Sequence, residues 1–295
     1  MSTPLHLRRP GNVPALAYEV HRPSGPVLGS VLLSHGFGEH RLRYGHVIDA
    51  WVKRGLLVLS YDLRGHGSSE GQRGHVEQFS DFLDDASALL EQLERLRDEA
   101  GVDGPSVVFG HSFGGLISIH LALRHPERVR LLALSSPFLG LAMQVPAVKL
   151  VLGRALSRYL PRFSLPNGIS PSILTHDQSI VNRTTADPLC GRMVSARWFT
   201  ETTAAQESAF ARAAELRVPI FCLYAGDDRL ALPSATRTFA QTVGSTNKVF
   251  RELPGQYHEI LNELERESTI AEYAAAMLSD RSEESASTAP VNASA

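Results

Sequence analysis

The sequence has little of several features that mark special classes of protein. It contains two cysteines, Cys190 and Cys222, in 295 residues. So few cannot form a disulfide framework, and although the pair could be bridged, we expect two reduced thiols. The N-terminus has no apolar run of the kind that a secretory signal needs, and no stretch approaches the roughly 18 uninterrupted apolar residues of a transmembrane helix. The sequence therefore predicts a soluble protein in the cytoplasm.

An excess of one sign of charge is also absent. Lysine and arginine number 29 and aspartate and glutamate 31, which gives a formal net charge of −2. Nothing in this balance draws the whole molecule to nucleic acid, so no nucleic-acid partner is expected. The hydrophobic share of 43%, with 23 glycines and 17 prolines, excludes a disordered, collagen-like or coiled-coil chain. What remains is a globular protein with a sizeable core.

Short apolar runs bounded by Gly, Pro or Asp predict strands that are buried on both faces, as in a parallel sheet. They are residues 30–34, 56–61, 106–109, 131–134, 220–224 and 248–253. Helical patterns lie between or after them, at residues 47–54, 82–99, 114–124, 234–243 and 260–278. An antiparallel pair, residues 5–9 and 15–21, opens the chain. This alternation predicts an α/β fold, with a mostly parallel central sheet and helices on both faces.

The alternation of strand and helix is interrupted once. Residues 138–217 contain no clear strand and several prolines. Since long loops without structure of their own are uncommon in a compact domain, we expect a helical cap inserted into the core. The predicted organisation is a core of residues 1–137, a cap of 138–217, a second part of the core at 218–278 and a tail of 279–295. The tail is small and polar, and we expect it to be disordered.

One motif carries a strong chemical signal. Gly110-His111-Ser112-Phe113-Gly114 follows a predicted strand and precedes a predicted helix, which is the context of a G-x-S-x-G nucleophile elbow. The sharp turn lifts the serine hydroxyl above the sheet, and the helix directs its free backbone N–H groups at the developing negative charge. An accidental glycine-rich turn is the alternative, and it leaves the partners of the serine unexplained.

A serine nucleophile needs a base that is itself oriented by an acid. In the fold that carries this elbow the chain order is serine, acid, histidine. Asp227 and Asp228 follow the strand predicted at residues 220–224, and His258 follows the next one. Both places lie at the carboxyl ends of strands, where open α/β sheets carry their sites. The position of His258 sets it apart from the other histidines, whereas either aspartate could be the acid.

From about residue 25 to 278 the chain resembles the monoacylglycerol lipase and lysophospholipase branch of the α/β-hydrolase superfamily. The resemblance rests on many short matches in one order rather than on any single motif. They are His35-Gly36-Phe37-Gly38-Glu39-His40 with Arg43-Tyr44, residues 61–71, the serine elbow, Ser136-Pro137, Ala186-Asp187-Pro188-Leu189, Asp228-Arg229-Leu230 and Tyr257-His258-Glu259.

The resemblance implies a role for each residue of the site. Ser112 is the nucleophile, His258 the base and Asp228 the orienting acid, because the family places its aspartate directly before an arginine and an aliphatic residue. The backbone N–H groups of Phe37 and Phe113 form the oxyanion hole. Glu39 and Arg43 are candidates for the polar end of the substrate. No metal and no cofactor is implied, and His40, His66 and His75 lack metal-ligand spacing. One departure, Leu261 where monoacylglycerol lipases tend to carry a second histidine, argues against strict glycerol specificity.

These residues predict a serine hydrolase that cleaves the ester of a monoacylglycerol or similar single-chain lipid through an acyl-enzyme. A lysophospholipase, a broad carboxylesterase, a peptidase and a non-catalytic receptor on the same fold are the alternatives. The apolar residues of the cap either pack on the core or line a tunnel for the acyl chain, and the cap could touch a membrane surface transiently. Activity should fall as the pH drops through the usual histidine pKa of about 6.5.

Overall fold

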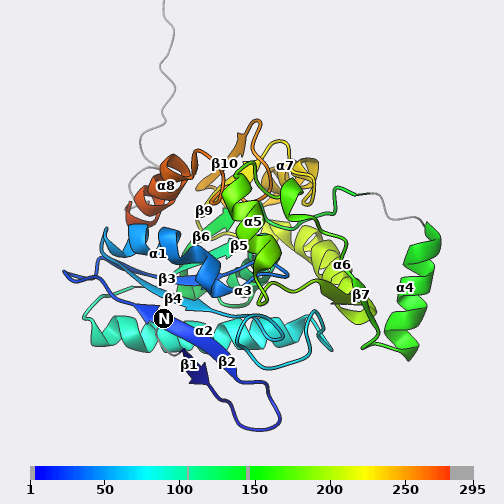
Figure 1. The fold of residues 1–295 in the computed structure, drawn as a ribbon. Coiled ribbons are helices and arrows are strands. Elements are labelled where there is room, and N and C mark those ends of the chain that lie inside the picture. The colour runs from blue at the N-terminus through cyan, green and yellow to red at the C-terminus, as the bar shows by residue number, and fades with distance from the viewer. Residues whose placement is uncertain (1–3, 105, 144–146, 280–295) are drawn as a thin grey trace, which may run out of the picture.

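The protein is built around an eight-stranded sheet, seen in a computed structural model that describes residues 4–104, 106–143 and 147–279 (Figure 1). In spatial order the strands are β1 (Leu5–Leu7), β2 (Leu16–His21), β4 (Leu56–Tyr61), β3 (Gly29–Ser34), β5 (Ser106–His111), β6 (Val129–Ser135), β9 (Ile220–Ala225) and β10 (Lys248–Leu253). The pairs β1–β2 and β2–β4 are antiparallel, and all other neighbours are parallel. The predicted opening pair and the predicted parallel sheet are therefore confirmed.

Helices cover both faces of the sheet, because side chains alternate along each buried strand. Val31 and Leu33 point to one face, where α1 (Gly45–Val52) and α8 (Arg266–Leu278) pack. Leu32 points to the other face, against α2 (Ser80–Glu99), α3 (Phe113–Arg124) and α7 (Pro233–Thr242). Each large apolar side chain buried in this way contributes roughly 1.5–3 kcal/mol. Short 3-10 turns at Arg41–Tyr44 (η1), Pro126–Arg128 (η2), Pro171–Ile173 (η3) and Ala213–Glu215 (η4) connect the larger elements.

Two predicted elements differ from those observed. β10 was expected to be buried on both faces, but it is the edge strand and its residues are exposed or half-buried, because only β9 pairs with it. The last helix was expected to begin at residue 260, whereas α8 begins at Arg266. Ile260 and Leu261 are buried in the core from a turn rather than from a helix. Their apolar character therefore imitated a helical pattern.

The insertion between β6 and β9 is mainly helical, as predicted. It contains α4 (Ala147–Tyr159), α5 (Gln178–Ala186) and α6 (Ala196–Ala211). It also holds a small antiparallel ribbon, β7 (Ser164–Pro166) with β8 (Met193–Ser195), that the sequence analysis did not predict, since strands of three residues leave no periodic pattern. α6 packs on the core, and α4 lies beside α6 at the margin of the molecule (Figure 1).

Three further expectations concern the whole chain. Cys190 and Cys222 are free thiols, as predicted. Within the described ranges no helix is both long and apolar enough to span a membrane. Apart from Ser279, which caps α8, the tail expected to be disordered lies outside the residues that the structure describes.

Candidate active site

Ser112 occupies the sharp turn between β5 and α3. Its backbone dihedrals are φ 52° and ψ −117°, a conformation that costs of order 1–3 kcal/mol and is typical of functional sites. Glycine is required on both sides of the turn. A Cβ on Gly110 would lie 2.3 Å from the carbonyl oxygen of Gly114, and a Cβ on Gly114 would lie 2.3 Å from that of Ser34. Close packing of Gly110 on α3 and of Gly114 on the end of β3 thus explains the small residues of the motif.

Ser112, His258 and Asp228 form one hydrogen-bonded chain. The Ser112 hydroxyl lies 2.8 Å from His258 Nε2, and His258 Nδ1 lies 2.6 Å from Asp228 Oδ2. The other carboxylate oxygen of Asp228 accepts from the backbone N–H groups of Leu230 and Ala231, both at 2.8 Å. All three side chains of the chain are buried.

The neighbouring Asp227 has an exposed side chain, whereas Asp228 contacts His258. The sequence alone left both aspartates as candidates for the acid, and in the structure only Asp228 of the two contacts His258. Burial lowers the pKa of His258, but the adjacent Asp228 carboxylate and its hydrogen bond outweigh burial, so the pKa lies above its ordinary 6.5. The Asp228 carboxylate thus favours the protonated form of the His258 imidazole.

A second histidine, His111, lies next to His258, with the ring centroids 5.0 Å apart. Its Nδ1 lies 3.0 Å from Ser135 Oγ. Burial lowers the pKa of His111 to about 4, so this imidazole is neutral at pH 7. A second positive charge beside His258 is thereby avoided.

Phe37 and Phe113 are the expected oxyanion donors. Phe37 lies in the loop after β3, and Phe113 directly follows Ser112 at the start of α3. Phe113 is the first residue of α3, so its backbone N–H has no partner within the helix. Phe37 follows β3, and the N–H of the preceding Gly36 donates to Glu39 Oε1 at 2.5 Å. The side chains of Phe37 and Phe113 both contact Trp198 of α6, with ring centroids 4.0 and 4.8 Å apart. Sequence reasoning missed Trp198, because nothing local marks an aromatic residue in the insertion as part of the site.

Glu39 and Arg43 are brought together in a buried ion cluster. Arg43 donates to Glu39 at 2.7 Å, to both oxygens of Glu259 at 2.8 and 2.7 Å, and to the Thr184 hydroxyl at 2.9 Å. Burial would raise the pKa of Glu39, but the Arg43 guanidinium overrides it and lowers the pKa to about 2. The pKa of Glu259 is also lowered, since Arg43 outweighs its burial. Two carboxylates therefore share one guanidinium, and the cluster carries one net negative charge.

Glu259 was not predicted from the sequence as a residue of the site. The available signal was a charged residue directly after His258 and before the apolar Ile260 and Leu261. Leu261, the departure from the monoacylglycerol lipase pattern, is buried in the core beside α1 and α8. Its backbone oxygen lies 2.8 Å from His46 Nε2. The polar wall beside His258 is thus supplied by Glu259 rather than by residue 261.

Ser112 and His258 open onto a cavity of about 480 Å³, within the usual size of small-molecule sites. Most of its wall is apolar and comes from the two oxyanion loops and the insertion: Phe37, Phe113, Phe138, Leu141, Val194, Trp198 and Phe199. Glu39, Arg43, Glu259 and His111 supply polar wall. The cavity therefore offers both an apolar surface for an acyl chain and hydrogen-bonding groups for a polar alcohol.

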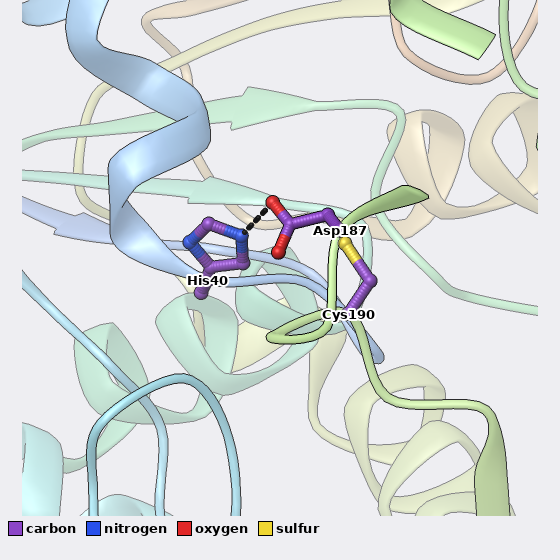
Figure 2. Close-up of side chains that lie close together, drawn as sticks. All are labelled: His40, Asp187 and Cys190. Atoms are coloured by element: carbon purple, nitrogen blue, oxygen red, sulfur yellow. Dashed lines mark hydrogen bonds and ion pairs between the residues drawn. The ribbon is translucent and has the colours of Figure 1, made fainter. Parts of the chain in front are cut away.

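Among the described residues, one group of three side chains has suitable atoms and spacing for a metal ion. The ligand atoms of His40, Asp187 and Cys190 lie within 4.8 Å of one another (Figure 2). A metal-bound histidine usually donates its other ring N–H to an acceptor, but His40 Nδ1 is buried without a hydrogen-bond partner in the described part of the chain. Burial raises the pKa of Cys190 to about 12, so its sulfur keeps the proton. A hydrogen bond between His40 and Asp187 describes the group better than a metal site.

The family described as serine aminopeptidase, S33, matches this chain over residues 25–265. The chain belongs to this hydrolase family. Phospholipase YtpA of Bacillus subtilis is 33% identical over 242 residues, which cover 81% of this chain and 91% of that protein. A monoacylglycerol lipase of Mycolicibacterium smegmatis is 30% identical over 259 residues, 86% of this chain and 90% of that one. An uncharacterized abhydrolase domain-containing protein of Dictyostelium discoideum is 30% identical over 263 residues, and the match spans 27% of its length.

A solved structure gives the same result for the fold. The monoacylglycerol lipase of Paleococcus ferrophilus superimposes with a TM-score of 0.81 at 28% identity, covering 89% of this chain and 98% of that one. The predicted resemblance and the predicted α/β-hydrolase fold are confirmed.

Proposed function

We propose that this protein hydrolyses the carboxylic ester of a monoacylglycerol or similar single-chain lipid through an acyl-enzyme. The observation that carries the proposal is the buried chain from Ser112 through His258 to Asp228, which opens onto a largely apolar cavity. Relatives named monoacylglycerol lipase and phospholipase support a lipid-ester hydrolase.

In the first half-reaction, Ser112 Oγ attacks the ester carbonyl carbon while His258 Nε2 takes the hydroxyl proton. The oxyanion accepts hydrogen bonds from the N–H groups of Phe37 and Phe113, each worth about 3 kcal/mol of transition-state stabilisation. His258 then protonates the leaving alcohol. In the second half-reaction His258 deprotonates a water, which attacks the acyl carbon, and Ser112 recovers its proton as the fatty acid leaves.

The ion cluster is the proposed contact for the leaving alcohol. Arg43 already uses four of the five N–H donors of a guanidinium on Glu39, Glu259 and Thr184. It is therefore poorly placed to receive a phosphate, whereas the carboxylate oxygens of Glu39 and Glu259 can accept from alcohol hydroxyls. This chemistry favours a neutral polyol such as glycerol over an anionic head group.

The second candidate is a lysophospholipase, since Phospholipase YtpA is 33% identical to this chain. One lining residue favours it: Arg192 is exposed at the cavity, where its guanidinium also donates to the Thr185 carbonyl, and it could meet a phosphate. A peptidase, the activity in the family's description, would bind the ammonium group of its substrate through carboxylates, and Arg43 neutralises one of the two charges that Glu39 and Glu259 carry.

A panel of substrates tests the proposal. Monoacylglycerols, lysophospholipids, short aryl esters and aminoacyl amides of matched chain length are compared with wild-type protein and with Ser112→Ala. We expect the highest kcat/KM on monoacylglycerols and a loss of at least about 10³-fold in the variant. Turnover retained by Ser112→Ala would refute the mechanism. If a fluorophosphonate fails to label Ser112, the protein is a receptor on a hydrolase fold.

We also propose that residues 138–217 act as a cap, and that this cytoplasmic enzyme touches membranes through it. Large apolar side chains of the cap are exposed to solvent, among them Val151, Leu152, Leu160 and Phe163. Contiguous exposed apolar surface is typical of lipid or protein contacts, and these four side chains lie within residues 151–163. The neighbouring Arg162 pairs with Glu77 and is largely exposed.

A further inference from the structure

The insertion contacts the loop that carries Phe37, here called the oxyanion loop (residues 35–43), directly through polar groups and not only through apolar packing. The Thr184 hydroxyl accepts from Arg43, Asp187 accepts from His40, and the Gly191 N–H donates to the Gly38 carbonyl at 2.8 Å. Thus residues 184–191 of the insertion bind residues 38–43, which directly follow Phe37.

The contact between His40 and Asp187 joins a buried side chain to one that is 27% exposed. His40 is 3% exposed, and its Nε2 donates to Asp187 Oδ2 at 2.9 Å (Figure 2). Asp187 ends α5, and its other oxygen accepts from the Leu189 N–H at 2.8 Å. One carboxylate therefore joins the end of α5 to the loop that follows β3.

These contacts hold the backbone on both sides of Phe37. On one side the Gly36 N–H is bound by Glu39, a residue of the core. On the other side Gly38 is bound by Gly191, and at φ 76° its Cβ position lies only 2.8 Å from the Gly191 carbonyl oxygen. His40, two residues further on, is bound by Asp187. The direction of the Phe37 N–H is thus set jointly by the core and by the insertion.

We propose that Asp187 is a positioning residue of the oxyanion hole: through His40 it fixes the loop that carries the Phe37 N–H. The inference rests on the proposed function, since it assigns a role to the insertion within the same reaction. The insertion then both covers the cavity and completes the oxyanion hole. A residue with this role affects the transition state more than the bound substrate.

Kinetics of three variants test the proposal. Asp187→Ala removes the acceptor, and we expect kcat to fall about 10- to 100-fold with KM changed less than about threefold, because misplacing an oxyanion donor costs at most what deleting it costs. Asp187→Asn keeps an oxygen that can accept from His40, and we expect it to retain at least about a third of wild-type kcat. His40→Leu removes the donor from the other side of the contact, and it should lower kcat with little change in KM, as Asp187→Ala does.

A transition-state analogue distinguishes a misplaced oxyanion donor from a general loss of active-site structure. An alkyl trifluoromethyl ketone forms a hemiketal oxyanion with Ser112, whereas a fatty acid product only occupies the cavity. In Asp187→Ala the inhibition constant of the ketone should rise by the same factor as kcat/KM falls, while the fatty acid binds as before. The double variant His40→Leu, Asp187→Ala should be no slower than the slower single variant, because both substitutions remove the same contact.

Asp177→Ala is the matched control. Asp177 caps the other end of α5 and pairs with Arg266, far along the helix from the oxyanion loop. We expect a lower melting temperature in this variant but kcat within about twofold of wild type. The proposal is wrong if Asp187→Ala and His40→Leu keep kcat within twofold, or if ketone and fatty acid affinities fall together. If the wild-type protein hydrolyses no ester through Ser112, the proposed function itself has failed, which is a separate result.

Discussion

Arg43 holds Glu259 by two parallel hydrogen bonds of 2.8 and 2.7 Å, directly beside the residue proposed as the base. Glu259 follows His258 in the chain, and Arg43 follows the loop that carries Phe37. The guanidinium therefore links the loop that bears the base to the loop that bears an oxyanion donor. A bidentate pair of this kind fixes geometry as well as charge.

The pH dependence of turnover should report His258. Only neutral His258 can accept the Ser112 proton, and its pKa is raised above 6.5 by Asp228 despite burial. We expect kcat/KM to decline tenfold per pH unit below that raised pKa and to level off above it. A pH profile with an uncharged short-chain ester measures this, and an acid limb that bends below pH 6.5 would contradict the assigned electrostatics.

Glu259→Gln should shift that profile. Burial is the largest influence on the pKa of His258 and lowers it, while the charges of Asp228 and, to a smaller extent, Glu259 raise it. Removing the Glu259 charge therefore moves the acid limb to lower pH. The free energy of unfolding should fall by about 1.5–3 kcal/mol, because a hydrogen bond to a buried charge is weakened. Glu272→Gln, on a surface pair with Arg251, is the control and should change neither quantity.

Gly114→Ala should destabilise the protein without touching the substrate. The added Cβ would meet the Ser34 and His35 carbonyl oxygens at 2.3 and 2.4 Å, so β3 or α3 must shift. We expect a loss toward the upper end of the roughly 1–3 kcal/mol typical of overpacked cores, measured by urea unfolding. Gly153→Ala, where a Cβ would meet nothing within 4 Å, should be neutral or slightly stabilising in its helix. Equal stability of the two variants would show that the elbow is less crowded than described.

Membrane contact should depend on the exposed face of the cap. Val151 and Leu152 are 66% and 57% exposed on α4. Replacing both with aspartate removes apolar surface that a bilayer would bury, so co-sedimentation with phosphatidylcholine vesicles should fall by about tenfold or more. Turnover of a water-soluble short-chain ester should stay within about twofold. Unchanged vesicle binding would locate the contact elsewhere.

Local sequence predicted those parts of the fold and site that depend on neighbours in the chain. The strand before Ser112 and the helix after it were recognisable, because both are regular and their glycines mark a tight turn. The prediction was wrong where an apolar stretch imitated another element, as with Ile260 and Leu261. The edge position of β10 was also not predicted, because the sequence of a single strand does not specify the order of the strands in the sheet.

The sequence by itself determined the order of Ser112, an aspartate at position 227 or 228, and His258, and their places at the ends of parallel strands. Parallel strands bring their carboxyl ends to one edge of a sheet, so those local signals sufficed to bring the three side chains together. Only the tertiary structure decided how Arg43 meets Glu259 across 216 residues and how His40 meets Asp187 across 147. Those pairs form because the insertion and the loop after β10 both return to the loop that follows β3. No local pattern specifies such a return, since it depends on packing of the whole chain.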